Sequence, residues 1–318
     1  MKKRILAAAI LLAAITGLAV GVPAVASTGG DADGNKHPDV GLILFYDADG
    51  RFRCSATLIS PTVVLTAAHC TTGTLGKTLV TFDSVIAEQP PSPFPVAADP
   101  TVGYTAAELA AAGYLSGTAY THPNYSNFTD LDNWNDVGVI VLDQPIASFG
   151  SGYPSVAPVG TLDAIKTSNL SKTLFTGVGY GTEVRKPDSG PQKPQPMSYP
   201  LLRRYVDMPG QKLTPQILQT NGNPNDNRGT GGTCFGDSGG PVFYQGSIVA
   251  VTSYGYTDNC RYLGGYQRVD IPVVRNWLLC VLGVVAKVPA NATATPAQPT
   301  PGAAAADQAC GSLKPTQD

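Results

Sequence analysis

Glycine and proline interrupt this chain so often that long helices have little room. Its 318 residues include 35 Gly and 27 Pro, while 43% are hydrophobic, which is enough to bury a core. Short runs rich in β-branched and aromatic residues, separated by turn residues, are typical of an all-β barrel or sandwich. The runs that predict strands are Val40–Tyr46, Thr57–Ile59, Val63–Leu65, Val137–Leu142, Leu174–Gly177, Pro241–Tyr244 and Ser247–Ser253. We therefore expect an all-β fold.

Two segments predict helices instead. Thr105 and Glu108 form a capping box before an alanine-rich stretch that ends at Gly113, which indicates a short surface insertion. Asp270 caps a second segment that has Pro272 in its first turn. The apolar residues spaced along one face of this second helix are Val273, Val274, Trp277, Leu278 and Val281. We expect the second helix to pack on the domain and close it.

The first residues predict export. Met1–Val20 opens with basic residues and runs into an apolar stretch, and Ala24-Val25-Ala26 has the small-x-small pattern of a signal-peptidase site. We therefore place a signal peptide at residues 1–26 and expect a secreted, extracellular protein. A membrane anchor is the alternative, but the apolar stretch is short for a membrane span.

The remaining chain divides by composition. Residues 27–36 predict a flexible segment or a short pro-segment, residues 37–285 a folded domain, and residues 286–318, rich in Ala, Pro and Thr, a flexible tail. Within the domain, Glu183–Pro200 predicts an exposed loop because it is dense in Pro, Lys and Gln. The net charge of −2 and the lack of a basic stripe argue against nucleic acid as a partner. We expect a monomer with no cofactor, no metal and no membrane contact after leader removal.

Six cysteines all follow the leader. An even number in an exported chain, without a Cys-x-x-Cys pair, favours disulfides over metal binding. Sequence alone permits about 15 pairings. Proximity along the chain favours Cys54–Cys70, Cys234–Cys260 and Cys280–Cys310, of which the third rests only on being left over.

The segment Cys234–Pro241 sets Ser238 among glycines, where the backbone can turn sharply and expose a hydroxyl and nearby N–H groups. A serine nucleophile also needs a base, and the segment contains none. Among the three histidines, His69 ends an apolar strand and precedes Cys70, a setting that would fix its imidazole. His37 and His122 lack this setting, and we interpret His122 as structural.

A carboxylate that orients the base should be buried. Asp136 directly precedes an apolar strand, which would carry it toward the interior. Asp130, Asp132 and Asp143 are interpreted as solvated turn residues. Asp136 is therefore the best candidate for the partner of His69.

Together these residues resemble the trypsin/chymotrypsin-like serine peptidases, in motif and in the order His, Asp, Ser. The similar segments span about His37 to Val284 and are Thr66–Cys70, Asn135–Val139, Gly236–Pro241, Cys54–Ile59, Ser253–Gly255 and Gly265–Val269. The resemblance implies two antiparallel six-stranded β-barrels with a cleft between them and a C-terminal helix. It also strengthens the first two disulfides.

The resemblance further implies a secreted serine endopeptidase that cleaves protein or peptide substrates through an acyl-enzyme and can meet proteinaceous inhibitors. Ser238 would be the nucleophile, His69 the base, and Asp136 the residue that holds the imidazole. The N–H groups of Gly236 and Ser238 would form the oxyanion hole.

Two positions depart from familiar members. Gly232 stands where trypsin carries an aspartate in its specificity pocket, so strict Arg/Lys preference is not expected and an apolar or aromatic side chain is favoured. Ser253, Gly255 and Gly264 would line this pocket, although Asp258 could overturn the preference. Many members also expose a new Ile- or Val-leading terminus that pairs with the aspartate before the serine. No Ile-Val-Gly-Gly segment occurs near residues 31–40, so Asp237 needs another partner or activation differs.

Two rival functions remain. Gly236–Gly240 also fits the elbow of an α/β-hydrolase esterase, but that elbow needs a following helix and the order Ser, acid, His. The other rival is a catalytically inactive secreted binding protein on the same fold. An intact triad argues against it without proving a formed oxyanion hole.

Overall fold

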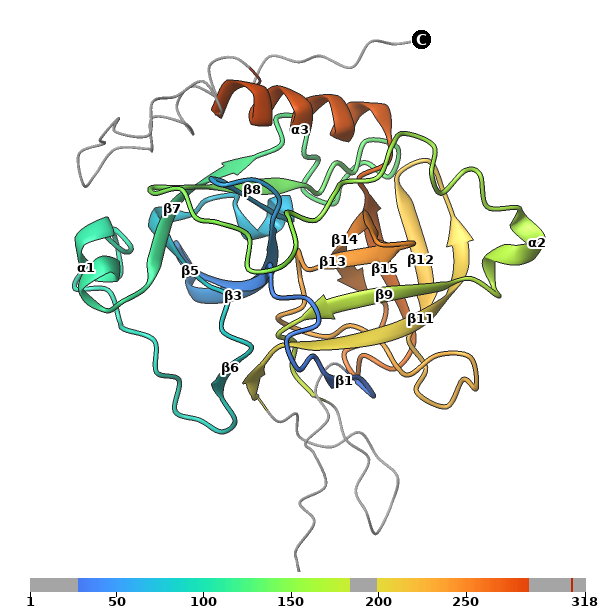
Figure 1. Cartoon of the computed structure of the whole chain (residues 1–318), viewed down its shortest axis with the longest axis horizontal. Coiled ribbons are helices and arrows are strands. Elements are labelled where there is room, and N and C mark those ends of the chain that lie inside the picture. Colours follow the sequence, from blue (N-terminus) through green and yellow to red (C-terminus); the bar gives the residue numbers. More distant parts are fainter. Residues whose placement is uncertain (1–27, 184–198, 286–309, 311–318) are drawn as a thin grey trace, which may run out of the picture.

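The computed structural model describes residues 28–183, 199–285 and Cys310. Two antiparallel β-barrels of six strands each lie side by side (Figure 1). The first barrel closes in the order β2-β3-β4-β8-β7-β5. Its strands are β2 (Val40–Asp47), β3 (Gly50–Leu58), β4 (Val63–Thr66), β5 (Leu75–Thr81), β7 (Leu115–Thr121) and β8 (Gly138–Leu142).

The second barrel closes because β11 pairs with two neighbours. The first half of β11 pairs with β9 and its second half with β12, on either side of Gly210. The strands of this barrel are β9 (Leu174–Gly179), β11 (Arg204–Leu213), β12 (Ile217–Asn221), β13 (Pro241–Tyr244), β14 (Ser247–Gly255) and β15 (Leu263–Arg268). The expected all-β fold of two six-stranded barrels is confirmed.

Smaller elements lie around the barrels. A 3₁₀ turn, η1 (Ala68–Cys70), follows β4. The capping box predicted at Thr105 and Glu108 is present at the start of α1 (Ala106–Ala111). The other minor elements are β1 (Asp31–Ala32), β6 (Val85–Ala87), β10 (Leu201–Leu202) and α2 (Thr167–Leu170).

The predicted C-terminal helix is α3 (Pro272–Val285), which lies across the top of the barrels in Figure 1. Its buried face, which includes Trp277 and Leu278, shares one core with Leu65 and Val139 of the first barrel and Val251 of the second. The helix therefore joins the two barrels. Burying side chains of this size contributes roughly 1.5–3 kcal/mol each.

The three disulfides are Cys54–Cys70, Cys234–Cys260 and Cys280–Cys310, the pairs favoured from the sequence. The third joins α3 to the buried Cys310. The remainder of the tail, the leader at 1–26 and residues 184–198 of the expected loop lie outside the described residues. Glu183 and Pro200, at the ends of that loop, are buried. No described helix is both long and apolar enough to cross a membrane.

The segment from Thr28 onward is packed against the second barrel. Thr28 is 1% exposed and its carbonyl accepts a hydrogen bond from the N–H of Gly232. Asp33 is fully buried and forms an ion pair with the buried guanidinium of Arg203, at 2.9 Å. Burial raises the pKa of Asp33, but hydrogen bonds from His37 and Arg203 outweigh it and bring the pKa to about 2. The carboxylate therefore stays charged in the folded protein at neutral pH.

Candidate active site

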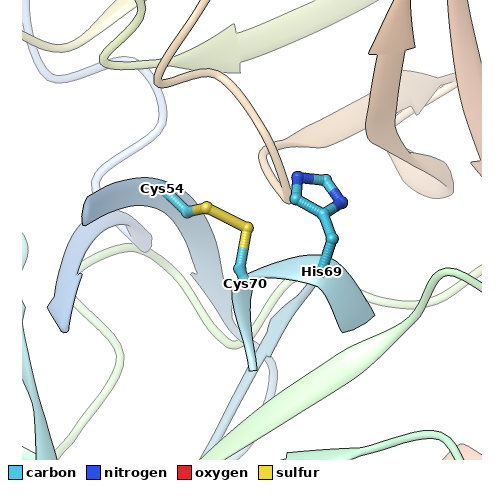
Figure 2. Close-up of side chains that lie close together, drawn as sticks. All are labelled: Cys54, His69 and Cys70. Atoms are coloured by element: carbon cyan, nitrogen blue, oxygen red, sulfur yellow. A yellow bond between two sulfur atoms is a disulfide. The ribbon is translucent and has the colours of Figure 1, made fainter. Parts of the chain in front are cut away.

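His69 is held by the covalent framework of the first barrel. It lies in η1, directly after β4, and its neighbour Cys70 is bonded to Cys54 of β3. Figure 2 shows the imidazole standing beside this disulfide. The three side chains lie as close together as metal ligands would. Because the two sulfurs are bonded to each other, neither can act as a thiolate ligand.

Asp136 is hydrogen-bonded to both the backbone and the ring of His69. One carboxylate oxygen accepts the backbone N–H of His69 at 2.9 Å, and the other lies 2.8 Å from the imidazole Nδ1. The Asp136 side chain is fully buried, whereas 22% of the His69 side chain is exposed. With a proton on Nδ1, the imidazole presents its Nε2 lone pair as a proton acceptor.

Three further side chains hold Asp136 in place, one of which bonds directly to its carboxylate. Ser253 of β14 donates its hydroxyl proton to Asp136 Oδ2 at 2.6 Å, and the indole N–H of Trp134 donates to Ser253 Oγ at 3.0 Å. The Asp136 backbone N–H donates to the side-chain oxygen of Gln267 at 2.9 Å. Gln267 and Ser253 belong to the second barrel, so the Asp136–His69 pair is held from both barrels. Sequence reasoning placed Ser253 in the substrate pocket and missed its bond to Asp136.

Ser238 lies on the turn before β13, beside the first barrel. Gly236 and Gly239 have φ of 99° and 74°, which a residue with a Cβ adopts only with strain. A Cβ at Gly239 would also overlap the Thr66 hydroxyl of β4. The Ser238 carbonyl accepts the N–H of Ser55 at 2.8 Å, so this turn is bonded to β3. Ser238 and His69 line the same cavity.

The backbone of this turn leaves two donors open. The N–H groups of Asp237, Gly239 and Gly240 all donate to backbone carbonyls. The N–H groups of Gly236 and Ser238 donate to no acceptor among the described residues. These are the two groups expected to form the oxyanion hole.

Asp237 is anchored by backbone donors. It is 1% exposed, and its two oxygens accept the N–H groups of Gly181 at 2.7 Å and Cys234 at 2.8 Å. A Cβ at Gly181 would overlap this carboxylate, so a glycine is required there. The partner that the sequence left unassigned therefore includes two backbone N–H groups.

The cavity beside Ser238 has a volume of about 330 Å³. All four residues expected in the specificity pocket, Gly232, Ser253, Gly255 and Gly264, line it. Gly232 packs so tightly on Gly222 that a Cβ there would lie 2.7 Å from the Gly222 Cα. Asp258 also lines the cavity, but as an exposed residue of the loop after β14.

Phe128 forms an aromatic wall over His69 that sequence reasoning missed. The two ring centroids are 5.7 Å apart, and Phe128 also meets Trp134 edge-to-face at 5.1 Å. Phe128 is 40% exposed and lines the same cavity. Asn127 and Phe128 both have positive φ, so the loop is held in a strained conformation to present this ring.

The other candidate residues lie away from Ser238. His122 is buried against Trp277 of α3, with the ring centroids 4.9 Å apart. His37 bonds to Asp33 and stacks on Phe243.

Among the remaining acids, Asp130 and Asp132 are exposed. Asp143 was expected to be solvated but forms an ion pair with the buried Lys77 at 2.8 Å. The hydroxyl groups of Thr118 and Ser116 bond to the Lys77 ammonium and to the Asp143 carboxylate, respectively.

Comparison with known proteins gives one consistent result. The family model described as Trypsin matches residues 31–278. Brachyurin of Leptuca pugilator is 30% identical over 229 residues, covering 70% of this chain and 84% of its own length. A protein named trypsin from Saccharopolyspora erythraea is 26% identical over 230 residues, covering 71% of this chain and 85% of its own length.

A solved structure titled HL collagenase aligns with a TM-score of 0.56 at 15% identity. It covers 82% of this chain and 99% of that one, and at this identity it supports the fold alone. The family match and the named peptidases agree with the two barrels and with the residues gathered beside Ser238. The chain therefore belongs to the trypsin family and is a serine endopeptidase.

Proposed function

We propose that the mature protein is a secreted endopeptidase whose Ser238, His69 and Asp136 act as a catalytic triad. The observation that carries the proposal is the buried Asp136 carboxylate bonded at once to the backbone and the imidazole of His69. This pair leaves Nε2 available toward the cavity that Ser238 lines.

The chemistry follows from these positions. His69 takes the hydroxyl proton as Ser238 attacks the scissile carbonyl, and it returns that proton to the departing amine. The N–H groups of Gly236 and Ser238 stabilise the oxyanion, and loss of one such donor typically costs about 10²–10³ in rate. A water molecule then attacks the acyl-enzyme. His69 takes the proton of the water and returns it to the Ser238 oxygen as the carboxylic acid product leaves.

The cavity favours an apolar or aromatic side chain next to the cleaved bond. Gly232, Gly255 and Gly264 add no charged or bulky side chain to its lining. A cationic side chain held beside these glycines would lack a counter-ion there, and burying an unpaired charge is costly. Asp258 is the acid that could compensate such a charge at the mouth, so a peptide library is the direct test of preference.

A fluorophosphonate probe tests the nucleophile. The wild-type protein should be labelled at neutral pH, and Ser238→Ala should not. Ser247→Ala, which removes only a hydroxyl that bonds to Ser155, is the matched control and should be labelled normally. Labelling that persists in Ser238→Ala would refute the assignment.

Two rival functions give different results. An inactive binding protein would leave Ser238 unlabelled, and an esterase would cleave an ester but not the corresponding peptide. N-terminal sequencing of the exported protein tests the signal peptide, since cleavage after Ala26 predicts Ser27 as the first residue. We further propose that the protein acts as a monomer on protein or peptide substrates and is open to proteinaceous inhibitors.

A further inference from the structure

A second cavity lies beside β3, and one of its lining residues, Arg53, borders the Ser238 turn. It has a volume of about 240 Å³ and is lined by residues of β2 and β3 and by Tyr199 and Leu201. It shares no described lining residue with the cavity beside Ser238. Its wall includes Arg51, Phe52 and Arg53, and no acidic side chain is among its described lining residues.

Arg53 lines this cavity with a guanidinium that is not fully paired within the described part of the chain. Its Nη2 is buried and meets no acceptor among the described residues. Burial lowers the pKa of the guanidinium, while attraction to the buried Asp237 favours its charged form. Arg51, two residues earlier on the same face of β3, donates one of its N–H groups to the carbonyl of Pro95.

The position of Arg53 relates this cavity to the reaction. A Cβ at Gly236 would lie 3.0 Å from the Arg53 Nε, so the guanidinium borders the segment that holds the oxyanion donors. Phe235 and Ser238, on either side of Gly236, line the first cavity. The turn at 235–238 therefore separates the two cavities.

A bound peptide must cross this turn. If the side chain before the cleaved bond occupies the first cavity, the residues after that bond leave on the opposite side. Because Arg53 borders this turn and does not line the first cavity, the residues after that bond are expected to pass the Arg53 cavity. Phe52, which is 44% exposed, offers an apolar surface for the methylene groups of an incoming side chain.

We propose that the Arg53 cavity binds an acidic side chain of the departing half of the substrate, and that Arg53 is a specificity-determining residue. This inference rests on the proposed function. A carboxylate matches the planar donors of a guanidinium and can accept two hydrogen bonds from it. A carboxylate in the cavity would pair with the charge of the Arg53 guanidinium, whereas an amide of the same shape would not.

The test compares peptides that share one acyl half and differ only at the first three residues after the cleaved bond. At each of these positions Glu is compared with Gln, and kcat/KM is measured for both. At one position the wild-type protein should prefer Glu by about tenfold, the ratio equivalent to about 1.4 kcal/mol. In Arg53→Gln this ratio should fall to about one, and in Arg53→Lys it should be intermediate. Any loss of activity common to both peptides cancels in the ratio.

Lys212→Gln is the matched control because it removes one exposed positive charge outside the cavity. It should keep the wild-type ratio. Raising the ionic strength to about 0.5 M should lower the ratio, since salt screens charge pairs that are open to solvent. A wild-type ratio near one at all three positions, or a ratio that survives in Arg53→Gln, would overturn the inference.

A short nitroanilide substrate has no residues to reach this cavity, so it reports on the proposed function alone. If it is cleaved while no acidic preference is found, only the inference about Arg53 fails. If neither it nor any peptide is cleaved, the proposed function fails.

Discussion

His122 should make the folded protein sensitive to mild acid. It is 2% exposed, packs edge-to-face on Trp277, and accepts the backbone N–H of Asn124 at its Nδ1. Burial lowers the pKa of His122 to about 4, although the nearby carbonyl of Val273 favours the protonated ring. In the unfolded chain the pKa of a histidine is about 6.5.

The sign and size follow from these two values. Between pH 6.5 and 4, His122 is protonated in the unfolded state but largely neutral in the folded state. The free energy of unfolding therefore falls as the pH falls. The stabilisation is complete above pH 6.5, and at pH 4.5 about 2–3 kcal/mol has been lost through this one group. Such a loss is a large fraction of the roughly 5–15 kcal/mol that stabilises a typical domain.

The variant His122→Gln isolates the effect, because glutamine keeps an acceptor for the Asn124 N–H and cannot be protonated in this range. Both proteins carry Ser238→Ala so that self-digestion does not interfere. Urea unfolding at pH 7.5 and pH 4.5 should show a pH-dependent loss about 2–3 kcal/mol smaller in His122→Gln, because all other titratable groups are the same in the two proteins. Equal losses in the two proteins, or an NMR titration of His122 near pH 6.5, would refute the reasoning.

Three further changes test other parts of the structure. Ser253→Ala removes a charge-assisted hydrogen bond to Asp136 that is typically worth about 1.5–3 kcal/mol, so kcat should fall about tenfold. Unchanged steady-state kinetics would show that this bond does not hold the carboxylate. Asp33→Asn leaves the buried Arg203 without its counter-ion and should lower the free energy of unfolding by about 3–5 kcal/mol in urea, whereas a loss below about 1 kcal/mol would contradict the role of the pair. Replacing both cysteines of the Cys280–Cys310 bond by serine should cost about 3–4 kcal/mol from loop closure, measured by thermal unfolding under non-reducing conditions, and a loss below about 1 kcal/mol would contradict this reasoning.

Local patterns were enough to place the strands that carry the site. The apolar runs before His69 and after Asp136 became β4 and β8, which pair directly and bring these two residues together. The strand expected after Ser238 is β13, with the bounds predicted. Each of these strands is apolar and uninterrupted, so its period and its ends can be read without knowing its neighbours.

Strands that depend on their partners were missed. β11 contains Pro209 and Gly210, residues that normally argue against a strand, yet it changes partner from β9 to β12 at this point. β15 contains Gly264 and Gly265, where side chains would overlap the rings of Tyr266 and Tyr254. In both strands the neighbours decide the conformation, and a local pattern carries no information about them.

The same limit applies to the site. The motifs identified the three residues proposed to act in catalysis, but not Phe128, whose exposed ring lies over His69 because of a strained loop. The role of Ser253 was also hidden, since its bond to Asp136 joins residues 117 positions apart. For Arg53 a local signal did exist, because two arginines alternate along β3 on one face.

The burial of Thr28 limits how the protein can be produced. Its carbonyl is bonded to Gly232 on the wall of the substrate cavity, and a Cβ at the next residue, Gly29, would overlap the carbonyl of Thr230. A fusion partner or affinity tag joined directly to Thr28 would have to begin inside this packed region. Tags for purification and surfaces for immobilisation should therefore not be joined next to Thr28, because they would disturb the wall of the substrate cavity.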